Sequence, residues 1–212
     1  MHPLEARLSE RADLAGVTLT GALRTTLLTY HDLLFRWNST INLTSITDPD
    51  EAIDRLLLEP VAAARHLPMG RALMDLGSGG GSPGIPMALA LGSPRLVLVE
   101  SKGRKAAFLR EAARAVGLTA VVEAARFEAL AVEARYHAQF DILSMRAVRM
   151  DEGSLSAAAT FVVPRGAIAL FVSAGAAPVL PAGLTLDCRA PLLPGSELVV
   201  LRRDVPRETT AV

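Results

Sequence analysis

The chain has 212 residues, half of them hydrophobic, which is enough for one well-buried domain with a modest appendage. Its 22 lysines and arginines balance 22 aspartates and glutamates, which argues against a uniformly basic nucleic-acid binder. The single cysteine, Cys188, excludes an internal disulfide and a cysteine-rich zinc site, and no apolar run reaches membrane-spanning length. Because the N-terminus carries charges from the outset, unlike a signal peptide, we expect a cytoplasmic protein.

Residues 1–70 are expected to form a helical extension. In residues 18–38 apolar side chains recur at helical spacing, with Thr20 as a candidate N-cap, which predicts an amphipathic helix. A polar turn region follows, and the next helix is expected over roughly residues 50–66. Pro60 is placed to kink that helix or to end it early.

From residue 72 the pattern alternates between short apolar strands and helices of ten or more residues. This alternation predicts right-handed βαβ units and a parallel sheet. The expected strands are residues 72–76, 95–100, 119–124 and 140–147, and the expected helices are residues 83–92 and 103–117. Two later strands, 166–173 and 196–204, are expected to form an antiparallel pair at one sheet edge. The sequence therefore predicts an α/β sheet domain over residues 71–212.

A glycine-rich segment, DLGSGGGSPGIP at residues 75–86, lies between the first strand and the following helix. Gly77, Gly79 and Gly81 are spaced two apart, which suits a backbone that turns tightly and lets a ligand approach at the carboxyl end of a strand. A phosphate-binding P-loop is excluded because the segment has no lysine. A dinucleotide fingerprint that starts at Gly79 still fits, with Pro83 inside it, and a tight turn without a ligand also stays open.

The better fit is the pattern Asp-x-Gly-x-Gly-x-Gly from Asp75 to Gly81, followed by an acid, Glu100, at the end of the next strand. A carboxylate there can accept hydrogen bonds from both hydroxyls of a ribose. This pattern resembles the first motif of the class I S-adenosylmethionine-dependent methyltransferases. The resemblance implies S-adenosylmethionine as the cofactor and a Rossmann-like fold, a mostly parallel seven-stranded sheet with helices on both faces, for residues 71–212.

Several further segments between about residues 30 and 150 resemble, in order and spacing, the glucose-inhibited division protein B family. They are RWNSTINLTSITDPDEA, DLGSGGGSPGIPMAL, VLVESKGRKAAFLREAARAVGL, ARFEAL and FDILSMRAV. Members of that family are bacterial enzymes that methylate N7 of one guanine in the 530 loop region of 16S rRNA. The resemblance therefore implies an rRNA (guanine-N7)-methyltransferase that acts on the small ribosomal subunit. We expect it to work as a monomer without a metal.

The same resemblance implies the site residues, position by position. It places cofactor contacts at Asp75, Gly77, Gly79, Gly81, Ser82, Glu100, Phe127, Glu128 and Arg146. Asn42, within INLTS, matches a polar position near the reaction site, where Arg146 is also expected. The fixed charge of Arg146 suits a phosphate, the O6 of the base or the cofactor, and the sequence does not decide among these.

Several positions on the side of the target base depart from the family pattern. The family's Arg-His pair and its Asp-Ser pair stand here as Arg55-Leu56 and Glu59-Pro60, and its Lys-Gly after the fifth strand stands as Val172-Ser173. An arginine expected before the last apolar run is Ser196 or Glu197. These departures favour an alternative function, a non-catalytic RNA- or ribosome-binding relative that keeps the methyltransferase fold.

Guanine N7 has a lone pair in the ring plane and no proton, so its methylation requires orientation and an unstacked base but no general base. RNA docking would use the basic residues that gather on one expected helix, and its affinity would fall steeply with salt, unlike that of a small-molecule methyltransferase. These basic residues are Lys102, Arg104, Lys105, Arg110 and Arg114.

Overall fold

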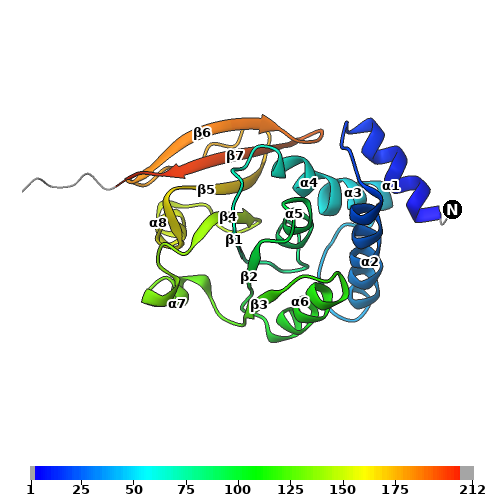
Figure 1. Cartoon of the computed structure of the whole chain (residues 1–212), viewed down its shortest axis with the longest axis horizontal. Coiled ribbons are helices and arrows are strands. Elements are labelled where there is room, and N and C mark those ends of the chain that lie inside the picture. Colours follow the sequence, from blue (N-terminus) through cyan, green and yellow to red (C-terminus); the bar gives the residue numbers. More distant parts are fainter. Residues whose placement is uncertain (1–2, 206–212) are drawn as a thin grey trace, which may run out of the picture.

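The computed structural model describes residues 3–205, which contain a seven-stranded sheet in the order β3-β2-β1-β4-β5-β7-β6 (Figure 1). The strands are β1 (Ala72–Leu76), β2 (Arg95–Val99), β3 (Ala120–Glu123), β4 (Phe140–Arg146), β5 (Val162–Ser173), β6 (Leu184–Pro191) and β7 (Ser196–Arg203). The first five strands run parallel, and β7 is antiparallel to both β5 and β6. The predicted α/β fold with its mostly parallel sheet is confirmed.

Helices cover both faces of this sheet (Figure 1). They are α1 (Pro3–Leu14), α2 (Gly21–Asn38), α3 (Pro49–Ile53), the π-helical turn η1 (Asp54–Leu58), α4 (Glu59–Ala64), α5 (Gly84–Ala90), α6 (Gly103–Ala115), α7 (Phe127–Leu130), the 3₁₀ turn η2 (Ala134–Tyr136) and α8 (Glu152–Phe161). Helices α1 to α6 pack on one face, and α7 and α8 pack on the other. Two hydrophobic clusters, one on each face, therefore form the core.

Strand β1 lies in the middle of the sheet between β2 and β4. All five of its residues are buried, because helices cover both of its faces. Successive side chains point to opposite faces, so Leu73 belongs to the cluster beneath α5 and Met74 to the cluster beneath α8. The glycine-rich segment follows β1 directly and therefore lies at the carboxyl edge of the sheet, near its centre.

Helix α2 is held against the glycine-rich segment. Thr20 is its N-cap, since the side-chain oxygen accepts a hydrogen bond from the backbone nitrogen of Leu23 at 3.2 Å. Tyr30 is fully buried, and its hydroxyl donates to the carbonyl oxygen of Gly80 at 2.5 Å. Leu34 of the same helix shares a hydrophobic cluster with Leu109 of α6. The helices before β1 thus pack into the same core as the sheet.

The helical segment before β1 differs in one respect from the expected helix over residues 50–66. It runs without interruption from Pro49 to Ala64, so Pro60 does not end it. Instead the helix widens into η1, where the backbone nitrogen of Glu59 donates to the carbonyl oxygen of Asp54, five residues earlier. A π-type turn makes room for a proline ring, which would clash with the carbonyl group four residues before it in a regular α-helix.

The sequence-based expectation did not include the helices α1, α7 and α8, the 3₁₀ turn η2 or the edge strand β6. Helix α1 buries only Leu8 and Ala12 and therefore has a weak apolar pattern. Strand β6 exposes most of its side chains, buries Leu184 and Ala190, and carries the half-buried Cys188. Within residues 3–205, none of the helices combines the length and the apolar character that crossing a membrane requires.

Candidate functional site

Two adjoining cavities lie at the carboxyl ends of the central strands. The first has a volume of about 840 Å³ and the second of about 520 Å³. Gly77, Glu100 and Ala147 line both of them, and these residues directly follow β1, β2 and β4. This edge of an open α/β sheet is where such folds bind ligands.

The glycine-rich segment lines the first cavity with Gly77, Ser78, Gly79, Gly80 and Ser82, and Gly77 also lines the second. Gly77 has φ +69°, and a Cβ atom there would lie 2.6 Å from Cγ2 of Val148, so glycine is required. Gly79 has φ +52°, yet the atom nearest to its Cβ would be the carbonyl oxygen of Gly77 at 3.7 Å. The protein leaves the space in front of Gly79 open, so a ligand can approach the backbone there.

Glu100 holds the segment in shape. Its Oε2 accepts a hydrogen bond from the backbone nitrogen of Gly79 at 3.0 Å, and its Oε1 accepts one from the backbone nitrogen of Lys102 at 2.7 Å. Each carboxylate oxygen has a second lone pair that remains available to a ligand hydroxyl. Glu100 therefore lines both cavities and also fixes the backbone around them.

Asp75 and Gly81 belong to the same segment but line neither cavity, because both are enclosed by the protein. Asp75 is fully buried, and its Oδ1 accepts a hydrogen bond from Oγ of Ser144 at 2.6 Å. Its Oδ2 finds no hydrogen-bond partner among residues 3–205. Gly81 has φ +91°, and a Cβ there would lie 2.8 Å from Cδ1 of Ile85. In this structure the two residues support the segment instead of facing a ligand.

The buried carboxyl group predicts an unusual pH dependence. Burial raises the pKa of Asp75 from 3.8 to about 6, although a hydrogen bond from Ser144 opposes the shift. Its contribution to folding is therefore fully present below the unfolded pKa and is lost as the pH rises through about 6. We expect the stability of the wild type relative to Asp75→Asn to fall by about 2 kcal/mol between about pH 4 and pH 8. Urea unfolding across this range measures the difference.

Asp151→Asn provides a control of opposite sign. Asp151 caps α8, and the hydrogen bond from the backbone nitrogen of Ser154, at 2.8 Å, lowers the pKa of its carboxyl group. Its contribution is present above the ordinary pKa of aspartate and is lost as the pH falls. The wild type should therefore gain stability over this variant as the pH rises. A difference at position 75 that does not vary with pH would contradict a raised pKa there.

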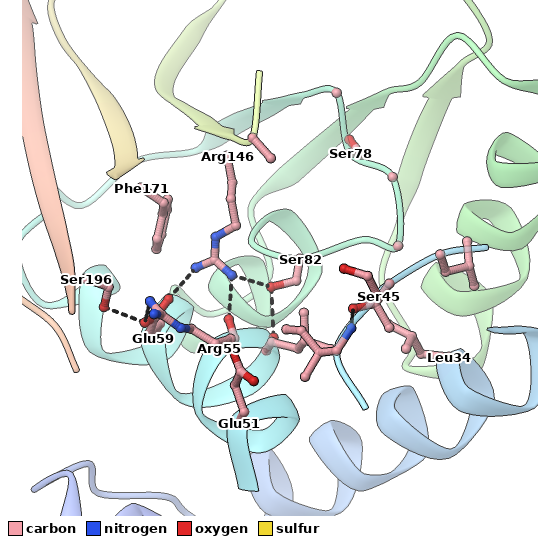
Figure 2. A pocket seen from close by; sticks show the side chains of 18 of the residues that line it. Leu34, Ser45, Glu51, Arg55, Glu59, Ser78, Ser82, Arg146, Phe171 and Ser196 are labelled. Carbon is pink, nitrogen blue, oxygen red and sulfur yellow. Dashed lines mark hydrogen bonds and ion pairs between the residues drawn. The ribbon is translucent and has the colours of Figure 1, made fainter. Parts of the chain in front are cut away.

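Arg146, the last residue of β4, lies in the wall of the first cavity (Figure 2). Its guanidinium carbon is 4.5 Å from the ring centroid of Phe171, which faces it across the β4–β5 ladder. Its Nη2 donates to Oε2 of Glu59 at 3.0 Å, and its Nη1 donates to the carbonyl oxygen of Arg55. Burial lowers the pKa of Arg146, the charge of Glu59 raises it, and an arginine remains protonated in either case.

Four residues around Arg146 receive no role from the sequence: Arg55, Glu59, Phe171 and Ser196. Glu59 is 2 % exposed and accepts hydrogen bonds from Arg55, Arg146 and Ser196, as Figure 2 shows. Three of the four, Arg55, Glu59 and Ser196, are among the residues given above as departures from the family pattern, and those departures were the available signal. Phe171 gives no signal, because it lies in an ordinary apolar strand.

The other predicted site residues divide between the two cavities. Asn42 and Ser82 line the first cavity; Asn42 is exposed, and Oγ of Ser82 donates to the carbonyl oxygen of Leu56 at 2.9 Å. Phe127 and Glu128 line the second cavity, where Phe127 is mostly buried and Glu128 is exposed. Across residues 3–205 no three histidine, cysteine or acidic side chains are grouped so that they would hold a metal ion.

Only some of the basic residues at α6 line a cavity. Lys102 and Lys105 line the first cavity. Arg110 instead donates from Nη2 to the carbonyl oxygen of Val122 at 3.0 Å, and Arg104 and Arg114 are exposed outside the lining of either cavity. Only the N-terminal end of α6 therefore adds positive charge to the site.

Sequence comparison yields one consistent family. Residues 24–174 match the family described as rRNA small subunit methyltransferase G. The chain is 42% identical over 170 residues to ribosomal RNA small subunit methyltransferase G of Stenotrophomonas maltophilia, covering 79% of this chain and 78% of that protein. It is 40% identical over 201 residues to the protein of the same name from Xanthomonas axonopodis, covering 90% of this chain and 92% of that protein.

Solved structures share the fold at low sequence identity. A putative O-methyltransferase from Klebsiella pneumoniae aligns with a TM-score of 0.57 at 14% identity, over 96% of this chain and all of that one. A structure described as MtNAS in complex with MTA and tNA aligns with a TM-score of 0.57 at 16% identity, over 94% of this chain and 75% of that one. These likenesses show the class I methyltransferase fold.

Proposed function

The chain belongs to the rRNA small subunit methyltransferase G family, and from this premise we propose its reaction. It transfers a methyl group from S-adenosylmethionine to N7 of a guanine in 16S rRNA, in the 530 loop region of the small ribosomal subunit. The observation that carries the proposal is the pair of adjoining cavities at the strand ends, with the open backbone of Gly79 and the carboxylate of Glu100 in their walls.

The walls of both cavities fit S-adenosylmethionine. Glu100 keeps lone pairs for the ribose hydroxyls, and the second cavity combines apolar Val99 and Phe127 with the acid Glu128, which suits an adenine. Gly79 leaves room for the amino-acid end of the cofactor beside the first cavity. When bound, this cofactor supplies an electrophilic methyl group. We propose that Gly77, Gly79, Ser82, Glu100, Phe127, Glu128 and Arg146 contact it, and that Asp75 and Gly81 support them from below.

The first cavity has room for the target base as well. Leu34 and Phe171 give it apolar walls, and Asn42 and Arg146 give it groups that hydrogen-bond. Because guanine N7 carries a lone pair and no proton, these side chains need to orient the base and exclude water, and no general base is required. We propose that Asn42 and Arg146 hold the base in this orientation.

Transfer of labelled methyl groups tests the reaction. Small ribosomal subunits from cells that lack this modification would be incubated with the protein and labelled S-adenosylmethionine, and the modified base would be mapped. Incorporation at one guanine N7 supports the proposal. Cofactor binding without any incorporation would favour the alternative, a non-catalytic ribosome-binding relative, which is suggested by the neutral Val172 and Ser173 in the cavity wall.

Docking of the rRNA predicts a salt dependence that two lysines control. Lys102 and Lys105 line the first cavity and are expected to contact phosphates. Replacing both with alanine should reduce the slope of log affinity against log salt concentration by about 1.5, since each phosphate contact contributes about 0.7 to 0.9. Filter binding to rRNA at several salt concentrations measures the slope. Arg114→Ala, at the far end of α6, should leave it unchanged, and an unaltered slope in the double variant would argue against this docking surface.

We propose that residues 1–70 act as an extension that forms the target side of the site, and that residues 71–212 form the cofactor-binding domain. Leu34 and Asn42 line the first cavity, which supports a role of residues 1–70 on the target side. We propose that the protein works as a monomer in the cytoplasm.

A further inference from the structure

Three distant parts of the chain meet at the carboxylate of Glu59 (Figure 2). Its Oε1 accepts a hydrogen bond from Nη1 of Arg55 at 2.8 Å and another from Oγ of Ser196, at the start of β7. Its Oε2 accepts one from Nη2 of Arg146 at 3.0 Å. Glu59 thus connects the helix before β1 with the ends of two strands, β4 and β7.

Within this cluster the carboxylate is buried and the two guanidinium groups are partly exposed. The side chain of Glu59 is 2 % exposed, that of Arg146 is 18 % exposed and that of Arg55 is 33 % exposed. A buried guanidinium group that loses its carboxylate partner retains the cost of desolvation without compensation. The guanidinium group of Arg146 is therefore most favourably placed where it contacts both the carboxylate of Glu59 and the ring of Phe171.

Pro60 explains why backbone acceptors are also available to Arg146. Proline has no N–H group, so it cannot donate to the carbonyl oxygen of Leu56, four residues earlier, or to that of Arg55, five residues earlier. The N–H group of Glu59 is directed to Asp54 in the π-helical turn. The two carbonyl oxygens accept instead from Ser82 and Arg146, which lie in the glycine-rich segment and at the end of β4.

We propose that Glu59 is a positioning residue that fixes the guanidinium group of Arg146 in the cavity wall, and that Pro60 supports it by freeing the carbonyl oxygens of Arg55 and Leu56. Glu59 and Pro60 stand where the sequence departs from its family's pattern. This inference rests on the proposed function in so far as Arg146 serves methyl transfer.

A double-mutant cycle between Glu59 and Arg146 tests the proposal. We expect Glu59→Ala to lower kcat for methyl transfer about thirtyfold and to have less than a twofold effect when Arg146 is already alanine, because Glu59 acts through that side chain. Glu59→Gln keeps an acceptor oxygen and should lower kcat only about threefold. This smaller loss amounts to rescue by the conservative variant. Pro60→Ala restores an N–H group that can donate to the carbonyl oxygen of Leu56 or Arg55, in competition with Ser82 and Arg146, and should lower kcat by a similar factor.

A second measurement needs neither cofactor nor substrate. In the free protein, the ¹⁵N resonances of the Arg146 side chain should show slow rotation of its guanidinium group. Glu59→Ala should make this rotation fast. Asp54→Asn is the matched control, since it removes an ion pair of the same helical turn, with Arg11, and neither residue lines a cavity. It should lower the melting temperature and leave both the rotation and kcat unchanged.

The outcomes separate this inference from the proposed function. Equal losses from Glu59→Ala in the presence and absence of Arg146, or an Arg146 side chain that rotates as before, would overturn the positioning role. A wild-type protein that fails to methylate rRNA would refute the proposed function, while the rotation measurement would still decide the role of Glu59. If Glu59→Ala does not fold, Glu59→Gln and Pro60→Ala carry the same cycle.

Discussion

Gly79→Asp is expected to bind S-adenosylmethionine at least 100-fold more weakly than the wild type while remaining folded. The nearest atom to a new Cβ is the carbonyl oxygen of Gly77 at 3.7 Å, so the protein itself accommodates the side chain. Its carboxylate would enter the cavity where the backbone is now open, close to the carboxylate of Glu100, which accepts from this same backbone nitrogen. Steric exclusion and like-charge repulsion therefore act on the ligand.

The φ angle of +52° at Gly79 adds a conformational cost of about 1 to 2 kcal/mol for a residue with a side chain. Gly92→Asp is the matched control, because Gly92 has φ +80° and a Cβ atom there would meet no other atom within 4 Å. It lies after α5, outside the lining of either cavity. Both variants should lose similar stability in thermal unfolding, and only Gly79→Asp should lose binding in calorimetry. Wild-type affinity in Gly79→Asp would refute the cofactor site.

Arg146→Ala is expected to lower kcat for methyl transfer by about 100- to 1000-fold, the loss typical of removing one preorganised donor from an active site. The substitution removes the cation from the cavity wall and leaves the carbonyl oxygen of Arg55 without its donor. Arg146→Lys retains the charge but cannot bind Glu59 and that carbonyl oxygen through one planar fork. We therefore expect it to lose at least about tenfold.

Arg95→Ala controls for the general loss of a stacked arginine. Arg95 lies over the ring of Phe140, with a guanidinium-to-centroid distance of 5.0 Å, and donates to the carbonyl oxygen of Gln139 at 3.1 Å. It begins β2, at the opposite end of the sheet from the cavities. Its loss should lower the melting temperature without changing kcat for methyl transfer. Equal kcat values for wild type and Arg146→Ala, measured on small ribosomal subunits, would show that Arg146 has no role in methyl transfer.

Local patterns in the sequence determined the sheet and the position of the ligand site. The apolar run over β1, the glycines after it and the acid after β2 are each encoded within a few residues. Such features can be read because periodicity, turn chemistry and strand order follow from short-range physical preferences. The same preferences failed for β6, whose exposed edge position removes the apolar signal.

Only the tertiary structure decided which of these residues line the cavities and which support them from the interior. Asp75 shares a motif with Gly79 but lines neither cavity, because its side chain is buried and accepts a hydrogen bond from Ser144 of the neighbouring strand. Glu59 reaches Arg146 and Ser196 across 87 and 137 residues of chain. Contacts over such separations depend on strand order, on the π-helical turn and on the packing of α4 against the sheet domain. A single sequence carries no local pattern for them, so it predicted the ligand and left the arrangement of the charged cluster to the fold.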